Sequence, residues 1–472
     1  MRMYTGPCSC AGSDKAANSQ AVLGQGDISM TTTVSDRQSG TKNHTGNHST
    51  ERPVVVVGTG PAGSMAAWLL ARQGKKVILL EEHASVGDPI QCTGILTRSV
   101  LKATELSEQD IDSVTAFVAK GTWVYAPDGS HADIPLKGDY VVYRNAFDAM
   151  LARRAETAGA TLLLRHRFVG IDKDTGEVLV EKKGAAATEG VAATGRPQIS
   201  DTSAHRSAIL RIKASALIGA DGPRSLVAKA AGIYERDDLP GGAGMAGKRA
   251  FVNAPQTVVR HKHKGIIEFF PHKEVIAWIV PEGPDTVRAG MCTYGNPAEA
   301  FNAFQKQYLG NDYRARTIGH QGGIIPVYNP LLRTETVVRP ADPGAQTGKT
   351  PSPGMRVLLI GDAATQVKPT TFGGIIQGAT AARCAVDALI AGDSYERRWK
   401  KALHADLAMG LRLRHAMDTM SDAQFNKLIR LCGKPRVARI FRDHDRDYPT
   451  QFGLRLLAAE PRLLFLAIKM FK

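Results

Sequence analysis

The sequence predicts an α/β protein that combines a parallel sheet flanked by helices with a mainly β segment and a helical C-terminal region. Three short apolar runs, at residues 53–57, 77–80 and 357–360, indicate buried strands. Around residues 250–330 the pattern becomes β-like, and from residue 395 onward helical periodicity dominates. At 472 residues the chain is long enough for two or three hydrophobic cores.

The first motif lies at residues 53–63 (PVVVVGTGPAG), where an apolar run is followed by three glycines. Gly58 makes a tight turn, Gly60 lets the backbone approach a pyrophosphate, and Gly63 allows the next helix to pack closely on the strand. The second apolar run ends at Glu81, whose carboxylate is correctly spaced to hold a ribose hydroxyl. This strand, glycine turn, helix and acid predict a dinucleotide site.

The second motif lies at residues 357–378 (VLLIGDAATQVKPTTFGGIIQG). Asp362 follows a predicted strand and can accept hydrogen bonds from sugar-type hydroxyls. The glycines at 373–374 open an alanine-rich helix over 379–391, so a flat ring can approach bare N–H groups and the positive helix end. We therefore expect the two motifs to hold one long dinucleotide between them.

The charge balance indicates an anionic partner. Lys and Arg total 60 against 45 acidic residues, a net charge of +15, and much of the excess lies after residue 395. Nucleic acid, anionic lipid and an acidic substrate all fit such a surplus. No recognised nucleic-acid motif accompanies it and aromatic residues make up only 6%. We expect a lipid surface and no nucleic acid.

The six cysteines show no metal-ligand spacing, so no metal is expected, and a disulfide framework is not predicted for a chain of this size. No apolar run is long enough to span a bilayer. Residues 1–51 are polar and lack the hydrophobic core of a signal peptide, although an organellar transit peptide is an alternative. We expect a cytoplasmic protein that is peripheral on the membrane surface.

These motifs resemble the FAD-dependent oxidoreductases of the glutathione-reductase-like superfamily, over residues 53–395. Within it the chain is similar to the geranylgeranyl reductase family, which includes archaeal digeranylgeranylglycerophospholipid reductases. Residues 87–94 (GDPIQCTG) match that family's G-x-P-x-x-C-x-G loop. Residues 361–374 are close to its G-D-A-A-G-x-V-x-P-x-x-G-G-G motif, with Thr365 in place of the first glycine after the alanine pair. Residues 395–430 resemble its C-terminal helical region.

The resemblance implies FAD as the cofactor and assigns its contacts by position. Gly58, Gly60, Ala62 and Gly63 would contact the pyrophosphate, Glu81 the adenosine ribose, and the backbone of Phe168 the adenine. Cys92, Thr93 and Gly94 would lie beside the flavin, and Gly374 and Ile375 at the isoalloxazine edge. Asp362 would contact the ribityl or pyrophosphate region, and Arg144 lies where the family has an arginine that contacts FAD. Cys92 is also the candidate catalytic residue, either as a proton donor or as a packing and gating group; its alternative is a small buried hydrophobe.

The predicted fold is an FAD-binding Rossmann-type (glutathione-reductase-like) domain with a β-sheet substrate domain and a C-terminal helical region. The expected segments are a disordered polar tail at 1–51, an FAD-binding domain in three parts at 52–180, 208–235 and 351–394, a surface insertion at 181–207, a mainly β substrate domain at 236–350, and a C-terminal helical region at 395–472.

Lipid-cavity residues are expected on one β segment. The family often shows an aromatic-x-Trp-x-Phe-Pro run there, and this chain keeps Trp278 and Pro281 but has Ile276 and Val280 beside them. The final segment, 454–472, mixes apolar and basic residues and predicts either a basic amphipathic helix on a membrane or a helix packed on the protein itself.

The resemblance implies reduction of isolated C=C bonds in geranylgeranyl chains of isoprenoid lipids. Because a second glycine fingerprint is lacking, we expect an external electron donor, either a reduced ferredoxin-like protein or NAD(P)H. An FAD-dependent monooxygenase or halogenase on the same scaffold is the first alternative. A non-catalytic, membrane-associated flavin electron carrier is the second.

Overall fold

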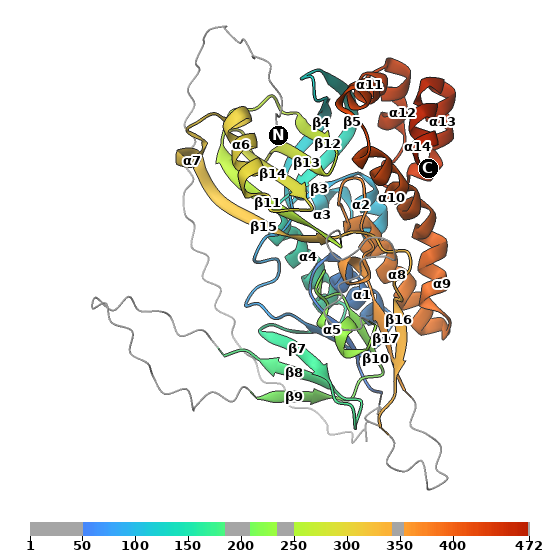
Figure 1. The fold of residues 1–472 in the computed structure, drawn as a ribbon. Helices are drawn as coiled ribbons and strands as arrows, with labels where there is room; N and C mark the ends of the chain where they lie inside the picture. Colours follow the sequence, from blue (N-terminus) through green and yellow to red (C-terminus); the bar gives the residue numbers. More distant parts are fainter. Residues whose placement is uncertain (1–50, 185–207, 234–249, 342–353, 471–472) are drawn as a thin grey trace, which may run out of the picture.

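The computed structural model describes residues 51–184, 208–233, 250–341 and 354–470. Most of the expected polar tail and of the expected insertion at 181–207 therefore lies outside the described residues. Within the described ranges the chain forms three sheets and a helical C-terminal region (Figure 1). None of the described helices is long and apolar enough to cross a membrane.

A six-stranded sheet is built from the apolar runs at its centre. All neighbours are parallel except the edge strand β16, which runs antiparallel to β17. The strands, in spatial order, are β16 (Glu335–Val338), β17 (Met355–Leu359), β10 (Ala216–Gly219), β1 (Val54–Val57), β2 (Val77–Leu80) and β6 (Thr161–Leu163). Apolar residues on both faces of the central strands are buried, which is why these runs show no alternation.

Different layers cover the two faces of this sheet. One face packs on helices α1 (Pro61–Arg72), α4 (Arg144–Thr157) and α8 (Ile375–Ala391). The other face packs on a small antiparallel sheet and on α5 (Leu226–Ala230). The strands of the small sheet are β7 (His166–Ile171), β8 (Val178–Lys182) and β9 (Ile209–Ile212).

An eight-stranded sheet forms the second layered unit. Its strands, in spatial order, are β15 (Thr317–Pro326), β11 (Phe251–Arg260), β14 (Thr286–Thr293), β13 (Val275–Pro281), β12 (Ile267–His272), β4 (Thr115–Tyr125), β5 (His131–Val142) and β3 (Ile95–Leu96). One face packs on α6 (Ala298–Leu309) and α7 (Tyr313–Arg316). The short helices α2 (Ser99–Thr104) and α3 (Glu108–Asp112) lie in the connection between β3 and β4.

The strands divide between the sheets differently from the expected segments. β3, β4 and β5 come from within 52–180, yet they extend the sheet that is formed mainly by 236–350. Conversely, β16 comes from within 236–350 and pairs with β17 at the edge of the six-stranded sheet. Strand pairing is decided by contacts between distant segments, which a linear division of the sequence does not contain.

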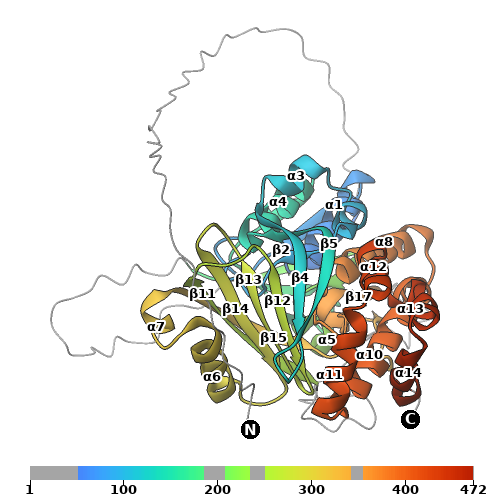
Figure 2. The same cartoon turned by 90° about the horizontal axis from the view of Figure 1, so that it is seen from above.

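The C-terminal region is helical, and Figures 1 and 2 show it on the side of the eight-stranded sheet opposite α6 and α7. Its helices are α9 (Tyr395–Trp399), a π-helical segment (Lys400–His404), α10 (Ala405–Asp418), α11 (Asp422–Cys432), α12 (Pro435–Asp443), α13 (Gly453–Ala459) and α14 (Leu464–Met470). Helices α11 and α12 pack on β5.

The final segment is not one amphipathic helix. α13 ends at Ala459, and a short 3-10 turn at Pro461–Leu463 separates it from α14, because proline cannot donate the helical hydrogen bond. Leu456, Leu457 and Phe465 pack on the core of the C-terminal region. Leu454 and Leu464 remain exposed, at 82% and 54%. The segment therefore combines a packed side with an apolar exposed side.

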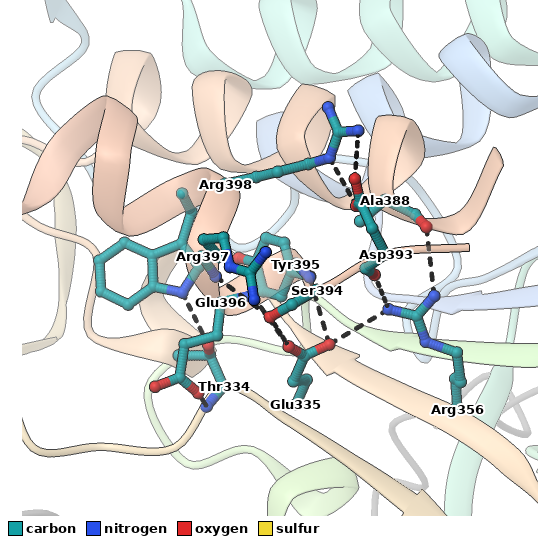
Figure 3. A network of polar contacts seen from close by, with 11 residues as sticks. Thr334, Glu335, Arg356, Ala388, Asp393, Ser394, Tyr395, Glu396, Arg397 and Arg398 are labelled. Atoms are coloured by element: carbon teal, nitrogen blue, oxygen red, sulfur yellow. Dashed lines mark hydrogen bonds and ion pairs between the residues drawn. The ribbon is translucent and has the colours of Figure 1, made fainter. Parts of the chain in front are cut away.

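A polar network fastens the C-terminal region to the edge of the six-stranded sheet (Figure 3). The Glu335 carboxylate in β16 accepts hydrogen bonds from Ser394 Oγ (2.5 Å) and from the backbone N–H groups of Tyr395 (3.3 Å) and Glu396 (3.1 Å). It also accepts one from Arg356 Nη2 at 3.1 Å. Glu335 thus satisfies free donors at the start of α9 and fixes where this helix begins.

Candidate functional site

The turn after β1 admits only glycine at two positions. Gly58 has a φ of 99°, and a Cβ on it would lie 2.4 Å from the Ala220 carbonyl oxygen. A Cβ on Gly63 would lie 1.9 Å from the Gly58 carbonyl oxygen, so α1 packs directly on the turn. Gly60 is the N-cap of α1, and within the described ranges no side chain caps it and nothing lies within 4 Å of an added Cβ. The first N–H groups of α1 are therefore open to an anion.

Glu81 lies at the end of β2 beside this turn and is 9% exposed. Its Oε2 accepts hydrogen bonds from the Thr59 hydroxyl and from Thr59 N–H (3.3 Å), and its Oε1 accepts one from His83 N–H at 2.9 Å. His83 Nδ1 also lies 2.6 Å from Oε1. A carboxylate offers about four acceptor sites, and Thr59 and His83 already contact both oxygens. A ribose hydroxyl would therefore replace one of these contacts, such as the Thr59 hydroxyl. Sequence reasoning missed His83, which carries no motif signal of its own.

The two glycine motifs meet at Ala62, as expected for one site built from both ends of the chain. A Cβ on Gly361 or on Gly378 would lie 3.1 Å from the Ala62 Cβ. Helices α1 and α8 pack side by side through these small residues. Phe168, in β7, is buried on the other face of the sheet, and β7 reaches Glu81 through the hydrogen bond from His166 N–H to the Glu81 carbonyl oxygen (2.8 Å).

A buried charged cluster lies between the two loops. The Arg144 guanidinium donates to both Asp148 carboxylate oxygens, at 3.1 and 2.8 Å, from one helical turn earlier in α4. It also interacts with the Cys92 thiol, and its charge acts on the Asp362 carboxyl. Burial raises the pKa of Asp362 to about 6, although the charge of Arg144 opposes this rise. Asp148, which sequence reasoning missed, could have been found from its i+4 spacing to Arg144.

The Cys92–Gly94 loop rests on a second buried arginine. Arg288 in β14 donates from Nη1 to the Thr93 carbonyl oxygen and to the Val142 carbonyl oxygen (3.0 Å), and from Nη2 to Glu282 Oε1 (2.6 Å). Gly94 has a φ of 78°, and a Cβ on it would lie 2.6 Å from the Val142 carbonyl oxygen. Arg288 therefore fixes the backbone that carries Cys92. No local pattern marks this role in the sequence.

A hydrogen-bonded chain joins this loop to the expected cavity residue Trp278. Thr93 Oγ1 donates to Gln256 Oε1 (2.6 Å), and Trp278 Nε1 donates to the same oxygen at 3.1 Å. The indole covers Gly290, where a Cβ would lie 2.3 Å from the ring. Trp278 belongs to the apolar cluster that also holds Ile276 and Val280.

Pro281 is not brought to the same face as Trp278. Side chains alternate along β13, and Ala277 and Ile279 lie in the cluster under α6, on the face opposite Trp278. Pro281 shares the parity of these two residues. The structure therefore links Trp278 to the Cys92–Gly94 loop through Gln256 but leaves Pro281 on the other side of the sheet.

The start of α8 lies beside Asp362. Gly374 is the N-cap and Ile375 the first helical residue, and among the described residues no side chain caps this end. A Cβ on Gly374 would lie 3.1 Å from Asp362 Oδ1. Gln377 Oε1, in the same turn, is buried without a hydrogen-bond partner in the described part of the chain. Free N–H groups and the Asp362 carboxyl thus lie together at the start of α8, and the buried Gln377 oxygen in the same turn is available to accept a hydrogen bond.

Residues of the C-terminal region support the loop that carries Asp362 through hydrogen bonds. Tyr395, fully buried in α9, donates its hydroxyl to the Leu359 carbonyl oxygen (2.8 Å) and accepts from Gln366 Nε2 (2.9 Å). Gln366 Oε1 in turn accepts from Gly361 N–H at 2.8 Å. The network of Figure 3 therefore continues into the turn that carries Asp362.

These features fit a long diphosphate-containing cofactor with a flat ring, and the comparisons with known proteins agree. The family described as "FAD binding domain" matches residues 51–306. A digeranylgeranylglycerophospholipid reductase of Methanothrix thermoacetophila is 30% identical over 406 residues, covering 80% of this chain and 90% of that protein. The chain belongs to this reductase family. It is an FAD-dependent oxidoreductase.

Other relatives extend the likeness. A digeranylgeranylglycerophospholipid reductase of Methanopyrus kandleri is 25% identical and covers 89% of this chain and 100% of its own length. A geranylgeranyl bacteriochlorophyll reductase-like structure from Thermoplasma acidophilum shares the fold with a TM-score of 0.67 at 19% identity, covering 88% of this chain and 99% of that one. A flavin-dependent brominase shares it less closely, with a TM-score of 0.51 at 17% identity, covering 89% and 94%. The reductase fold is the better match.

Proposed function

We propose that this family member reduces isolated C=C bonds in the geranylgeranyl chains of an isoprenoid lipid or lipid precursor. One observation supports the proposal beyond the relatives' names: the loop that carries Asp362 also contributes Val367 and Phe372 to a buried apolar cluster of the eight-stranded sheet. That cluster, which includes Trp278, Val367 and Cys292, lies between the 361–374 loop and the eight-stranded sheet. Such surroundings suit a hydrocarbon chain and exclude water from it.

FAD, when bound, supplies the two-electron hydride chemistry. It would be held by the residues predicted for it: Gly58, Gly60, Ala62, Gly63, Glu81, Cys92, Thr93, Gly94, Arg144, Phe168, Asp362, Gly374 and Ile375. The open N-termini of α1 and α8 would hold the pyrophosphate and the electron-rich edge of the ring.

Saturation of an alkene also needs a proton at the second carbon, and Cys92 is the proposed donor. Gly94 N–H donates to its sulfur at 3.4 Å, so the backbone of the same loop orients the thiol. Arg288 would act as a positioning residue, because it fixes the loop backbone beside Cys92.

The test is to incubate the dithionite-reduced holoenzyme with geranylgeranyl lipids of different head groups and to read product masses. Each reduced bond adds two hydrogens, so masses should rise in steps of about 2 Da. Cys92→Ser should retain the yellow flavin spectrum and reduce chains at least about 100-fold more slowly. If the reduced, flavin-loaded protein left every such lipid unchanged, the proposal would be lost. Oxygen-dependent NAD(P)H consumption with a hydroxylated or halogenated product would instead favour the alternative chemistry.

The electron donor and the membrane surface complete the proposal. We infer an external donor, either NAD(P)H or a reduced ferredoxin-like protein, and turnover with each donor in place of dithionite distinguishes them.

Association with a membrane surface is supported by Leu454, Leu464 and Ile468, which are 82%, 54% and 50% exposed on α13 and α14. Basic side chains of Arg455, Arg462 and Lys469 accompany them.

A further inference from the structure

Two residues of the 361–374 loop adopt a backbone conformation that favours glycine. Thr365 has a φ of 55° and Phe372 a φ of 57°. The left-handed region is disfavoured for a β-branched or aromatic side chain. The motif that this loop resembles has glycine at both positions. Each side chain must therefore make contacts that offset the unfavourable backbone.

Thr365 gains a hydrogen bond. Its hydroxyl accepts from Asn329 N–H at 3.0 Å, and the residue is 1% exposed. Its side chain thus serves the backbone of the connection between β15 and β16. It is not a member of the apolar cluster that holds Trp278.

Phe372 gains apolar contacts instead of a hydrogen bond. It is 8% exposed and belongs to the same cluster as Trp278, Ile276 and Val280. These last two are the positions on β13 where the resemblance led us to expect aromatic residues. The aromatic bulk in this cluster therefore comes partly from the flavin loop, two residues before the N-cap of α8.

The turn around Phe372 holds the ring in place. Phe372 N–H donates to the Lys368 carbonyl oxygen (2.8 Å), and Lys368 N–H donates to the Gly373 carbonyl oxygen (3.0 Å). The Lys368 ammonium is paired with the buried Asp447 carboxylate. Pro369 packs on α10, where a Cβ on Gly410 would lie 3.1 Å from its ring. These contacts fix the backbone that carries the ring.

We propose that Phe372 is a specificity-determining residue, which limits how far a prenyl chain extends past Trp278 toward the start of α8. This inference rests on the proposed function, since it assigns the ring a role in admitting its substrate. The ring fills part of the apolar cluster that it shares with Trp278. Its removal would open apolar volume in that cluster, so longer chains should bind better relative to shorter ones.

The test compares Phe372→Gly with Thr365→Gly in the FAD-loaded protein. Both changes relieve the same left-handed strain, but only the first removes volume from the cluster. Affinities for farnesol and geranylgeraniol are measured by calorimetry, and relative kcat/KM values for matching prenyl lipids are measured by mass spectrometry. Phe372→Gly should shift the preference toward the longer chain by about tenfold or more. Thr365→Gly should leave that ratio unchanged.

A second, milder variant keeps the test valid if Phe372→Gly does not fold. Phe372→Leu keeps an apolar side chain and should give an intermediate shift. The inference is overturned if Phe372→Gly and Thr365→Gly change the ratio equally, or if neither Phe372 variant changes it while the flavin spectrum is retained. The affinity measurements separate this inference from the proposed function. If the Phe372 variants alter chain-length affinity but no lipid is reduced, the role of Phe372 is supported and the reductase proposal is wrong.

Discussion

The stability of the protein without its cofactor depends on whether the buried Asp362 carboxyl is ionised. Burial raises its folded pKa to about 6, above the ordinary value of 3.8. A group with a raised pKa binds its proton more tightly in the folded state. Its contribution to stability is therefore fully present below about pH 4 and is lost as the pH rises through about 6.

Asp362→Asn should remove this pH dependence. The variant cannot ionise, so it should gain stability over the wild type between about pH 5 and about pH 7, by on the order of 2 kcal/mol. Urea unfolding of both cofactor-free proteins at the two pH values measures the difference. Asp443→Asn, on an exposed carboxylate paired with Arg442, is the control and should show no such gain. An equal gain for both variants would contradict the assignment to Asp362.

Some residues of the site could be predicted from the sequence, and others could not. Gly58 and Gly63 were predictable from the motif because backbone geometry excludes other residues there, whereas Gly94 was predicted from the resemblance of its loop to the family. Arg288 was not, because its partners Thr93 and Val142 lie far away in the sequence. A motif records what touches the cofactor, but it does not record what holds those residues.

At the scale of elements, the 361–374 loop is clamped by the C-terminal region. Lys368 pairs with Asp447, which is 2% exposed and also accepts from Thr97 Oγ1 at 2.6 Å. Although burial opposes it, the charge of Lys368 lowers the pKa of Asp447 to about 2. This pair thus stabilises the fold above about pH 4, and the stabilisation is lost as the pH falls toward about 2.

Lys368→Met should break this clamp. It leaves a buried carboxylate without its cation, which costs about 3–5 kcal/mol in the free energy of unfolding. Because the loop is then held less firmly, FAD should also dissociate faster. Denaturant unfolding and flavin-release kinetics measure the two effects. Lys400→Met, which removes a more exposed ion pair with Glu396 on the helix surface, should cost less than about 1 kcal/mol. A comparable loss in both variants would rule out a special role for Lys368.

At the scale of the whole molecule, the C-terminal helices combine exposed apolar side chains with an excess of basic residues. Replacing Leu454, Leu464 and Ile468 together with serine should lower binding to vesicles containing anionic lipid by about tenfold or more. Co-sedimentation at low and high salt measures it, since screening weakens the basic contribution.

A matched triple variant tests whether any exposed apolar residues would serve. Ile209, Ile318 and Leu331 are 51%, 56% and 68% exposed on other elements. Replacing these three with serine should leave vesicle binding unchanged. If both triple variants lost binding equally, or if the wild type ignored anionic vesicles, membrane association through α13 and α14 would be wrong.

The sequence alone determined the α/β core and the glycine turn of a dinucleotide site after β1, because each depends on a local run of residues whose geometry is dictated nearby. The resemblance of its motifs to a known family identified the dinucleotide as FAD. Only the tertiary structure decided that β3–β5 join the second sheet, that Pro281 faces away from Trp278, and that Lys368 is held by Asp447. These outcomes depend on contacts between segments far apart in the chain. Such contacts form from the packing of the whole molecule and leave no periodic trace in the sequence.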